Sequence, residues 1–104
     1  MKPSKKKQLE AKGWKVGGIR DFLGLSAEEE ALIDLKLTLA REVAAQRKAR
    51  GMTQAEVARH IGSSQSRVAK IEGGDPSVSV DLLLKTLFKL GAKKEEIGRT
   101  IAAA

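Results

Sequence analysis

The sequence predicts an all-α fold, and three observations support that prediction. No stretch alternates apolar and polar residues as a half-buried strand does, whereas apolar residues recur at helical spacing from residue 26 onward. Serine or threonine stands before four of these apolar runs, and glycine follows most of them, as at the two ends of helices. Aromatic residues make up only 3% of the chain, so the predicted core is aliphatic.

The 104 residues divide into an arm, a short extension and one folded domain. Residues 1–12 are charged and nearly free of apolar side chains, so they bury too little surface to offset the entropy of ordering, and we expect a flexible basic arm. Residues 13–25 bring apolar side chains among glycines, which predicts a turn-rich N-terminal extension. Residues 26–104 are expected to form the domain. The arm either lies along phosphates or in the minor groove of an anionic nucleic-acid partner, or it stays solvated.

The first helix of this domain is expected to be long. Ser26 and Glu29 have the spacing of a capping box, no breaker follows before Arg50, and Gly51 suits a left-handed cap. The basic residues at 47, 48 and 50 would offset the negative end of the helix and attract an anionic partner. The apolar residues form two adjacent stripes, 32-35-39-43 and 33-37-40-44, wider than one packing face requires. The N-terminal segment or a second subunit would cover the spare stripe.

Four shorter helices are expected after this one. Their expected ranges are 54–61, 65–72, 80–90 and 93–103. The expected N-caps are Thr53, either Ser63 or Ser64, and Ser79. The apolar residues of the helix expected at 80–90 should belong to the core: Leu83, Leu84, Leu87, Phe88 and Leu90.

The helices expected at 54–61 and 65–72 are separated by a single turn, and together they form a helix-turn-helix pattern. Their inward positions are Val57, Ile61, Val68 and Ile71, and Gly62 makes the turn. The segments 47–58 and 62–74 resemble the Cro/phage-repressor (XRE) helix-turn-helix family in Thr-Gln-Ala-Glu at 53–56, the turn glycine and Ile-Glu-Gly at 71–73. The resemblance covers roughly residues 37–90. It implies a compact five-helix lambda-repressor-like domain, here with a long first helix and an N-terminal extension.

The resemblance also implies a sequence-specific DNA-binding transcriptional regulator, an autoregulatory repressor of a palindromic operator. Residues 65–72 would be the recognition helix in the major groove of double-stranded DNA. The residues expected to read bases are Gln65, Ser66 and Lys70, and a glutamine amide can pair with both N6 and N7 of adenine. The residues expected at phosphates are Gln54, Ser64 and Arg67, although an outward arginine can equally be solvated. Members usually bind as homodimers to two half-sites about 34 Å apart.

Residues 13–26 and the acidic turn after them also resemble antitoxins of the HigA type, which pair with RelE/HigB-like ribonuclease toxins. That resemblance implies a protein that neutralises a small basic toxin and represses its own operon. Trp14 and Phe22 are the candidate anchors for such a partner, or they cover the spare face of the long helix. A third possibility is a coactivator resembling multiprotein bridging factors, which use this domain for protein contacts.

Composition and charge narrow the functional classes to which the protein can belong. The net charge of +7 and the pI near 9.9 indicate an anionic partner, and residues 41–70 carry seven Lys or Arg against two Glu. The absence of cysteine and the single histidine, His60, argue against a metal site, thiol chemistry or a catalytic triad, so we expect no enzyme and no cofactor. No apolar run is long enough for a membrane span or a signal peptide, and a cytoplasmic protein is expected.

Overall fold

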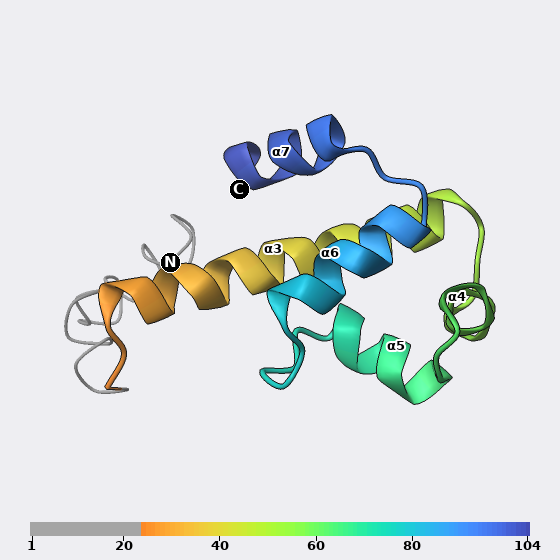
Figure 1. Cartoon of the computed structure of the whole chain (residues 1–104), viewed down its shortest axis with the longest axis horizontal. Helices are drawn as coiled ribbons and strands as arrows, with labels where there is room; N and C mark the ends of the chain where they lie inside the picture. The colour runs from red at the N-terminus through yellow and green to blue at the C-terminus, as the bar shows by residue number, and fades with distance from the viewer. Residues whose placement is uncertain (1–23) are drawn as a thin grey trace, which may run out of the picture. The chain divides into compact units, whose positions relative to one another are not determined.

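The computed structural model of the chain describes residues 24–104. The expected arm, nearly all of the expected extension, and the candidate anchors Trp14 and Phe22 lie outside the described residues. The described part is all-helical and contains no strand (Figure 1). Its helices are α3 (Ala27–Ala49), α4 (Gln54–Ile61), α5 (Gln65–Glu72), α6 (Val80–Lys89) and α7 (Lys94–Ala103).

Two compact units divide the chain between Leu35 and Lys36, within α3. The described part of the first unit is residues 24–35, which contain the start of α3. The predicted capping box is present there, because the hydroxyl of Ser26 accepts from the backbone N–H of Glu29 at 3.1 Å and the Glu29 carboxylate accepts in return. Leu32 and Ile33 are about half exposed, at 46% and 45%. These two side chains come from different predicted stripes, so neither stripe is buried along its whole length.

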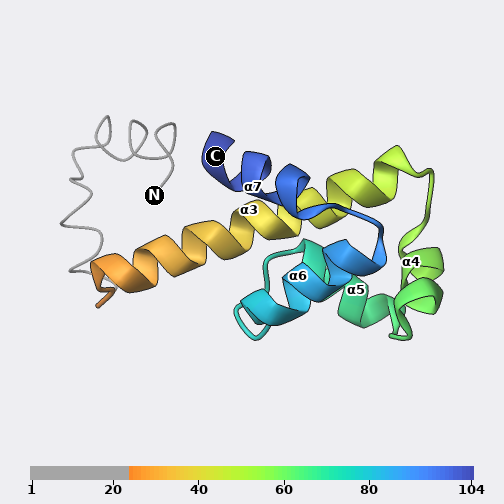
Figure 2. The same cartoon turned by 45° about the horizontal axis from the view of Figure 1, so that its top comes forward.

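The second unit, Lys36–Ala104, holds the aliphatic core. Figure 2 shows the C-terminal half of α3 with α7 on one side and α5 on the other. The fully buried large side chains of this core come from α3, α4, α5 and α6: Leu39, Val43, Val57, Val68, Ile71, Leu83, Thr86 and Leu87. The inward positions predicted for the helix-turn-helix are therefore confirmed, with Ile61 also buried.

The prediction that Phe88 belongs to the core is wrong, because its side chain is 48% exposed. The buried positions of α6 are Leu83, Thr86 and Leu87, which share one face at helical spacing, and position 88 turns about 100° away from Leu87. Thr86 takes a buried place because its hydroxyl donates to the carbonyl of Leu82 at 2.7 Å. The α6 cap residue Leu90 is buried as predicted.

Candidate nucleic-acid interface

The helix pair α4 and α5 is set by its caps. Thr53 begins α4 with a capping box, in which its hydroxyl accepts from the backbone N–H of Glu56 and its own N–H donates to the Glu56 carboxylate. Gly62 ends α4 at φ +71°, a left-handed conformation that glycine adopts without steric cost. Ser64, not Ser63, is the N-cap of α5, and its hydroxyl accepts from the N–H of Arg67 at 3.2 Å. The two helices therefore begin and end close to where the sequence predicts.

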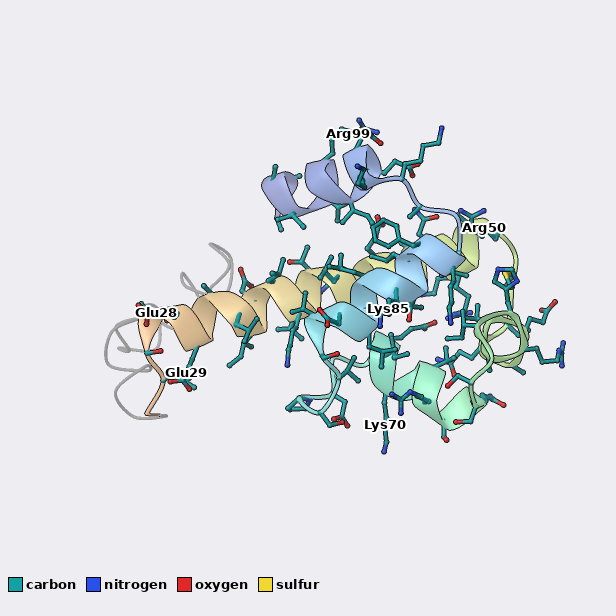
Figure 3. All side chains as sticks on the ribbon, in the orientation of Figure 1. Glu28, Glu29, Arg50, Lys70, Lys85 and Arg99 are labelled. Atoms are coloured by element: carbon teal, nitrogen blue, oxygen red, sulfur yellow. The ribbon has the colours of Figure 1, made fainter. Side chains whose placement is uncertain are left out.

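One face of α5 is buried and the opposite face is polar and exposed. Val68 and Ile71 have no exposed surface and face the core. The exposed residues of α5 are Gln65, Ser66, Arg67, Ala69 and Lys70. Figure 3 shows the Lys70 side chain extending away from α6 into open space. The three residues expected to read bases thus all lie on the exposed side of this helix.

The residues expected at phosphates lie around the same helix pair. Ser64 stands at the amino end of α5, and its hydroxyl also lies 3.2 Å from that of Ser66. Arg67 is exposed on α5. Gln54 is the first residue of α4 and is half-buried, and its side-chain amide donates to the carboxylate of Glu72 at 3.3 Å. The amide of Gln54 therefore has a fixed orientation, and one of its N–H groups is already used within the protein.

An ion pair that the sequence reading missed holds the carboxyl end of α5. The Arg47 guanidinium donates to Glu72 through Nε at 2.7 Å and through Nη2 at 3.1 Å, and its Nη1 donates to the carbonyl of Met52 at 3.0 Å. The two side chains are 17% and 8% exposed. The hydrogen bonds to Glu72 raise the pKa of the Arg47 guanidinium above its ordinary value. Arg47, read from sequence as a dipole-offsetting cation, thus ties α3 to α5.

The single histidine of the chain has a structural role. The ring Nε2 of His60 lies 2.8 Å from the carbonyl of Lys89 and joins α4 to α6. Across residues 24–104, no group of three His, Cys, Asp or Glu side chains is placed to hold a metal ion. In the same part of the chain, no helix is both long and apolar enough to cross a bilayer.

Comparison with known families decides how this helix pair is classified. Residues 38–99, more than half of the chain, match the family described as "Helix-turn-helix domain". The chain belongs to the helix-turn-helix domain family. The matched span runs from the C-terminal half of α3 into α7 and includes the whole of α4, α5 and α6. Neither a curated protein nor a solved structure matches the chain significantly.

Membership of the helix-turn-helix domain family identifies a DNA-binding regulator and agrees with the XRE/Cro resemblance. Every buried residue in the described part of the chain, from Thr38 to Ile97, lies within the matched span. The exposed face of α5 lies within it as well.

Proposed function

We propose that the protein is a sequence-specific transcriptional regulator that reads a palindromic operator through α5 and represses its own gene. The observation that carries the proposal is the division of α5 into a fully buried face, at Val68 and Ile71, and an exposed polar face. A helix that packs on the core with one face and is polar on the other can enter a major groove without exposing apolar surface. Its packed face also keeps it from rotating.

The residues of that polar face divide by chemistry. Gln65, Ser66 and Lys70 offer an amide, a hydroxyl and an ammonium to base edges. Gln54, Ser64 and Arg67 would contact phosphates, with the positive ends of α4 and α5 adding to the attraction. Phosphate contacts fix the register, and base contacts select the sequence.

A homodimer is part of this proposal. An eight-residue α5 is about 12 Å long and spans only a few base pairs, so one copy cannot specify an operator. Exposed apolar side chains on α6 and α7, Phe88 and Ile101, are candidate contacts between copies. Ile97, also on α7, is only 5% exposed and belongs to the core, so it is not a candidate. Sedimentation equilibrium with and without operator DNA measures the stoichiometry directly.

The decisive experiment is fluorescence anisotropy with DNA from upstream of the protein's own gene and a scrambled duplex, over a salt series. Gln65→Ala should weaken binding to the upstream DNA by about 5- to 150-fold, equivalent to ~1–3 kcal/mol, and leave the salt-dependent binding to scrambled DNA unchanged. Gln46→Ala, on α3 and outside the proposed interface, is the matched control. Equal affinity of the wild type for both duplexes would refute sequence-specific regulation.

A second candidate function is an antitoxin that neutralises a RelE/HigB-like ribonuclease toxin and co-represses its operon. The start of α3 favours it, because Glu28 and Glu29 are exposed one turn from the half-exposed Leu32 and Ile33. An acidic surface with apolar anchors is complementary to a small basic protein. Co-expression with the product of the neighbouring gene tests this: a complex that is lost on a joint Leu32→Asp and Ile33→Asp change supports it, and no complex refutes it.

A further inference from the structure

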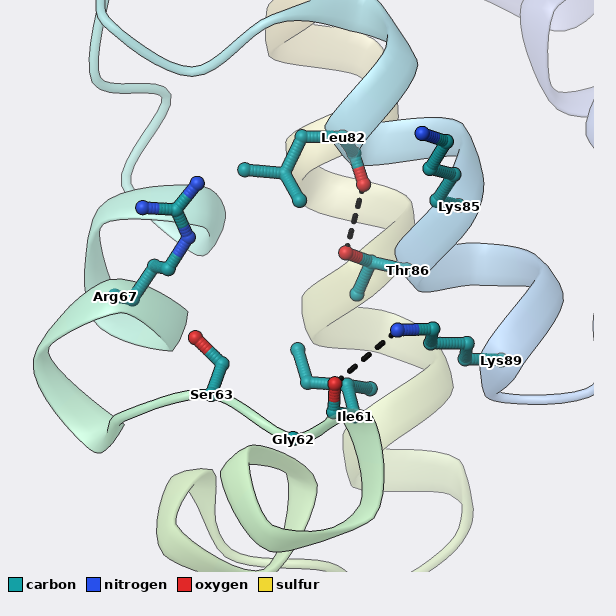
Figure 4. Close-up of a pocket in the computed structure, with 8 residues that line it drawn as sticks. All are labelled: Ile61, Gly62, Ser63, Arg67, Leu82, Lys85, Thr86 and Lys89. Carbon is teal, nitrogen blue, oxygen red and sulfur yellow. Dashed lines mark hydrogen bonds between the residues drawn. The ribbon is translucent and has the colours of Figure 1, made fainter.

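A pocket of about 180 Å³ opens where the turn between α4 and α5 meets α6. Its walls include the turn residues 61–63, Arg67 of α5, and Lys85 and Lys89 of α6 (Figure 4). Leu82 and Thr86 lie between the basic side chains, and the Thr86 hydroxyl is occupied by the carbonyl of Leu82 at 2.7 Å. The pocket therefore has a largely apolar floor and basic walls.

The charge around this pocket is of one sign. Three of its lining residues are cationic and none is acidic. Arg67 and Lys85 are exposed and form no ion pair with another residue of the described part of the chain. Lys89 donates to the carbonyl of Ile61 at 3.2 Å, and its ammonium group has two further N–H bonds. Positive charges around one pocket repel one another, and a bound anion would offset this repulsion.

We propose that this pocket binds a phosphate group. The guanidinium of Arg67 can present two parallel N–H donors to a tetrahedral oxyanion, the lysines add charge, and Ser63 adds a hydroxyl. The phosphate comes either from a DNA backbone beside α5 or from a phosphorylated small molecule. The DNA source rests on the proposed function, whereas the small-molecule source stands without it.

Thermal unfolding of the full chain in inorganic phosphate, against sodium chloride at equal ionic strength, tests the site itself. At ten times the dissociation constant, phosphate should stabilise the protein about 11-fold and raise the melting temperature by roughly 7–9 °C. Arg67→Gln and Lys85→Gln should each remove most of this shift, while Lys94→Gln and Arg99→Gln, exposed on α7, should keep it. Lys89 is left unchanged because it also holds the end of α4.

Anisotropy with DNA distinguishes the two sources. Lys85→Gln makes this distinction, because Lys85 lies outside the residues proposed above to contact DNA. If the pocket takes a backbone phosphate, Lys85→Gln weakens binding to upstream and scrambled DNA by the same factor and reduces the magnitude of the slope of log affinity against log salt by about 0.9. If it takes a small molecule, Lys85→Gln binds DNA as the α7 controls do but loses the stabilisation by phosphate. A protein that fails to bind DNA refutes the proposed function and leaves the unfolding experiment to decide on the pocket.

The proposal is overturned if phosphate stabilises the wild type no more than chloride does and the DNA affinity of Lys85→Gln matches that of the α7 controls. It is also overturned if phosphate stabilises the wild type, Arg67→Gln and Lys85→Gln equally. Both results would mean that the basic walls act only through net charge.

Discussion

Replacing Glu72 with alanine removes three hydrogen bonds that join α3, α4 and α5, two from Arg47 and one from Gln54. Losing one partner of a buried ion pair costs about 3–5 kcal/mol, and losing an exposed one about 0–1 kcal/mol. Exposures of 17% and 8% place this pair near the buried limit, and Arg47 keeps its bond to the Met52 carbonyl. We therefore expect Glu72→Ala to lower the free energy of unfolding by about 2–4 kcal/mol.

A loss of that size is a large part of the ~5–10 kcal/mol that holds a small domain together, and it corresponds to a melting temperature roughly 10–25 °C lower. Circular dichroism at 222 nm during urea and thermal unfolding measures it, with Glu95→Ala, exposed on α7, as control. A double-mutant cycle with Arg47→Ala isolates the coupling, expected above about 1 kcal/mol. The reasoning is refuted if Glu72→Ala has the same urea midpoint and melting temperature as Glu95→Ala. It is also refuted if the losses of unfolding free energy in Glu72→Ala and Arg47→Ala add up to the loss in the double variant.

Three further predictions concern the core, the turn and the pH dependence. Leu87→Ala should cost about 2–5 kcal/mol of unfolding free energy, and Phe88→Ala less than about 1 kcal/mol, in urea titrations, because only Leu87 is fully buried. Gly62→Ala should cost ~1–2 kcal/mol from strain at φ +71°, whereas Gly98→Ala inside α7 should stabilise by up to about 1 kcal/mol; the reverse order of melting temperatures would contradict this. The N–H of Thr53 donates to Glu56 and lowers the pKa of that carboxyl, so its stabilisation is present above the ordinary value of 4.5 and is lost as the pH falls below it. Glu56→Gln should flatten the acid limb of a plot of melting temperature against pH.

The ends of the helices could be predicted from sequence because capping is local. The four hydroxyl caps each accept the backbone N–H of the residue three positions later, so the whole interaction lies within four consecutive residues: Ser26, Thr53, Ser64 and Ser79. The choice between Ser63 and Ser64 stayed open because both precede the apolar run and both have a hydroxyl. The structure separates them, because Ser64 is extended and its hydroxyl accepts from the N–H of Arg67.

The contacts between helices could not be predicted in this way. Arg47 and Glu72 are 25 positions apart, and Gln54 and Glu72 are 18 apart, so their meeting depends on how three helices cross. The prediction for Phe88 is wrong because apolar residues crowd α6 on more than one side, and the sequence does not say which side faces the core. The exposed positions of α5 agree with the resemblance, and the roles of Gln65 and its neighbours on DNA stay predictions.

Glu72 lies at the carboxyl end of α5, so its ion pair with Arg47 affects the charge and the orientation of this helix as well as the stability of the fold. A carboxylate in the last turn of α5 adds to the negative end of the helix dipole and, in the proposed complex, would stand near DNA phosphates. Arg47 offsets that charge from within the protein while its two bonds resist rotation of α5. Because Ser64 fixes the other end of the helix, the exposed face is held before DNA arrives, and little ordering entropy opposes binding. The same ion pair therefore serves the fold and, in the proposed complex, would also orient the exposed face of α5 on DNA.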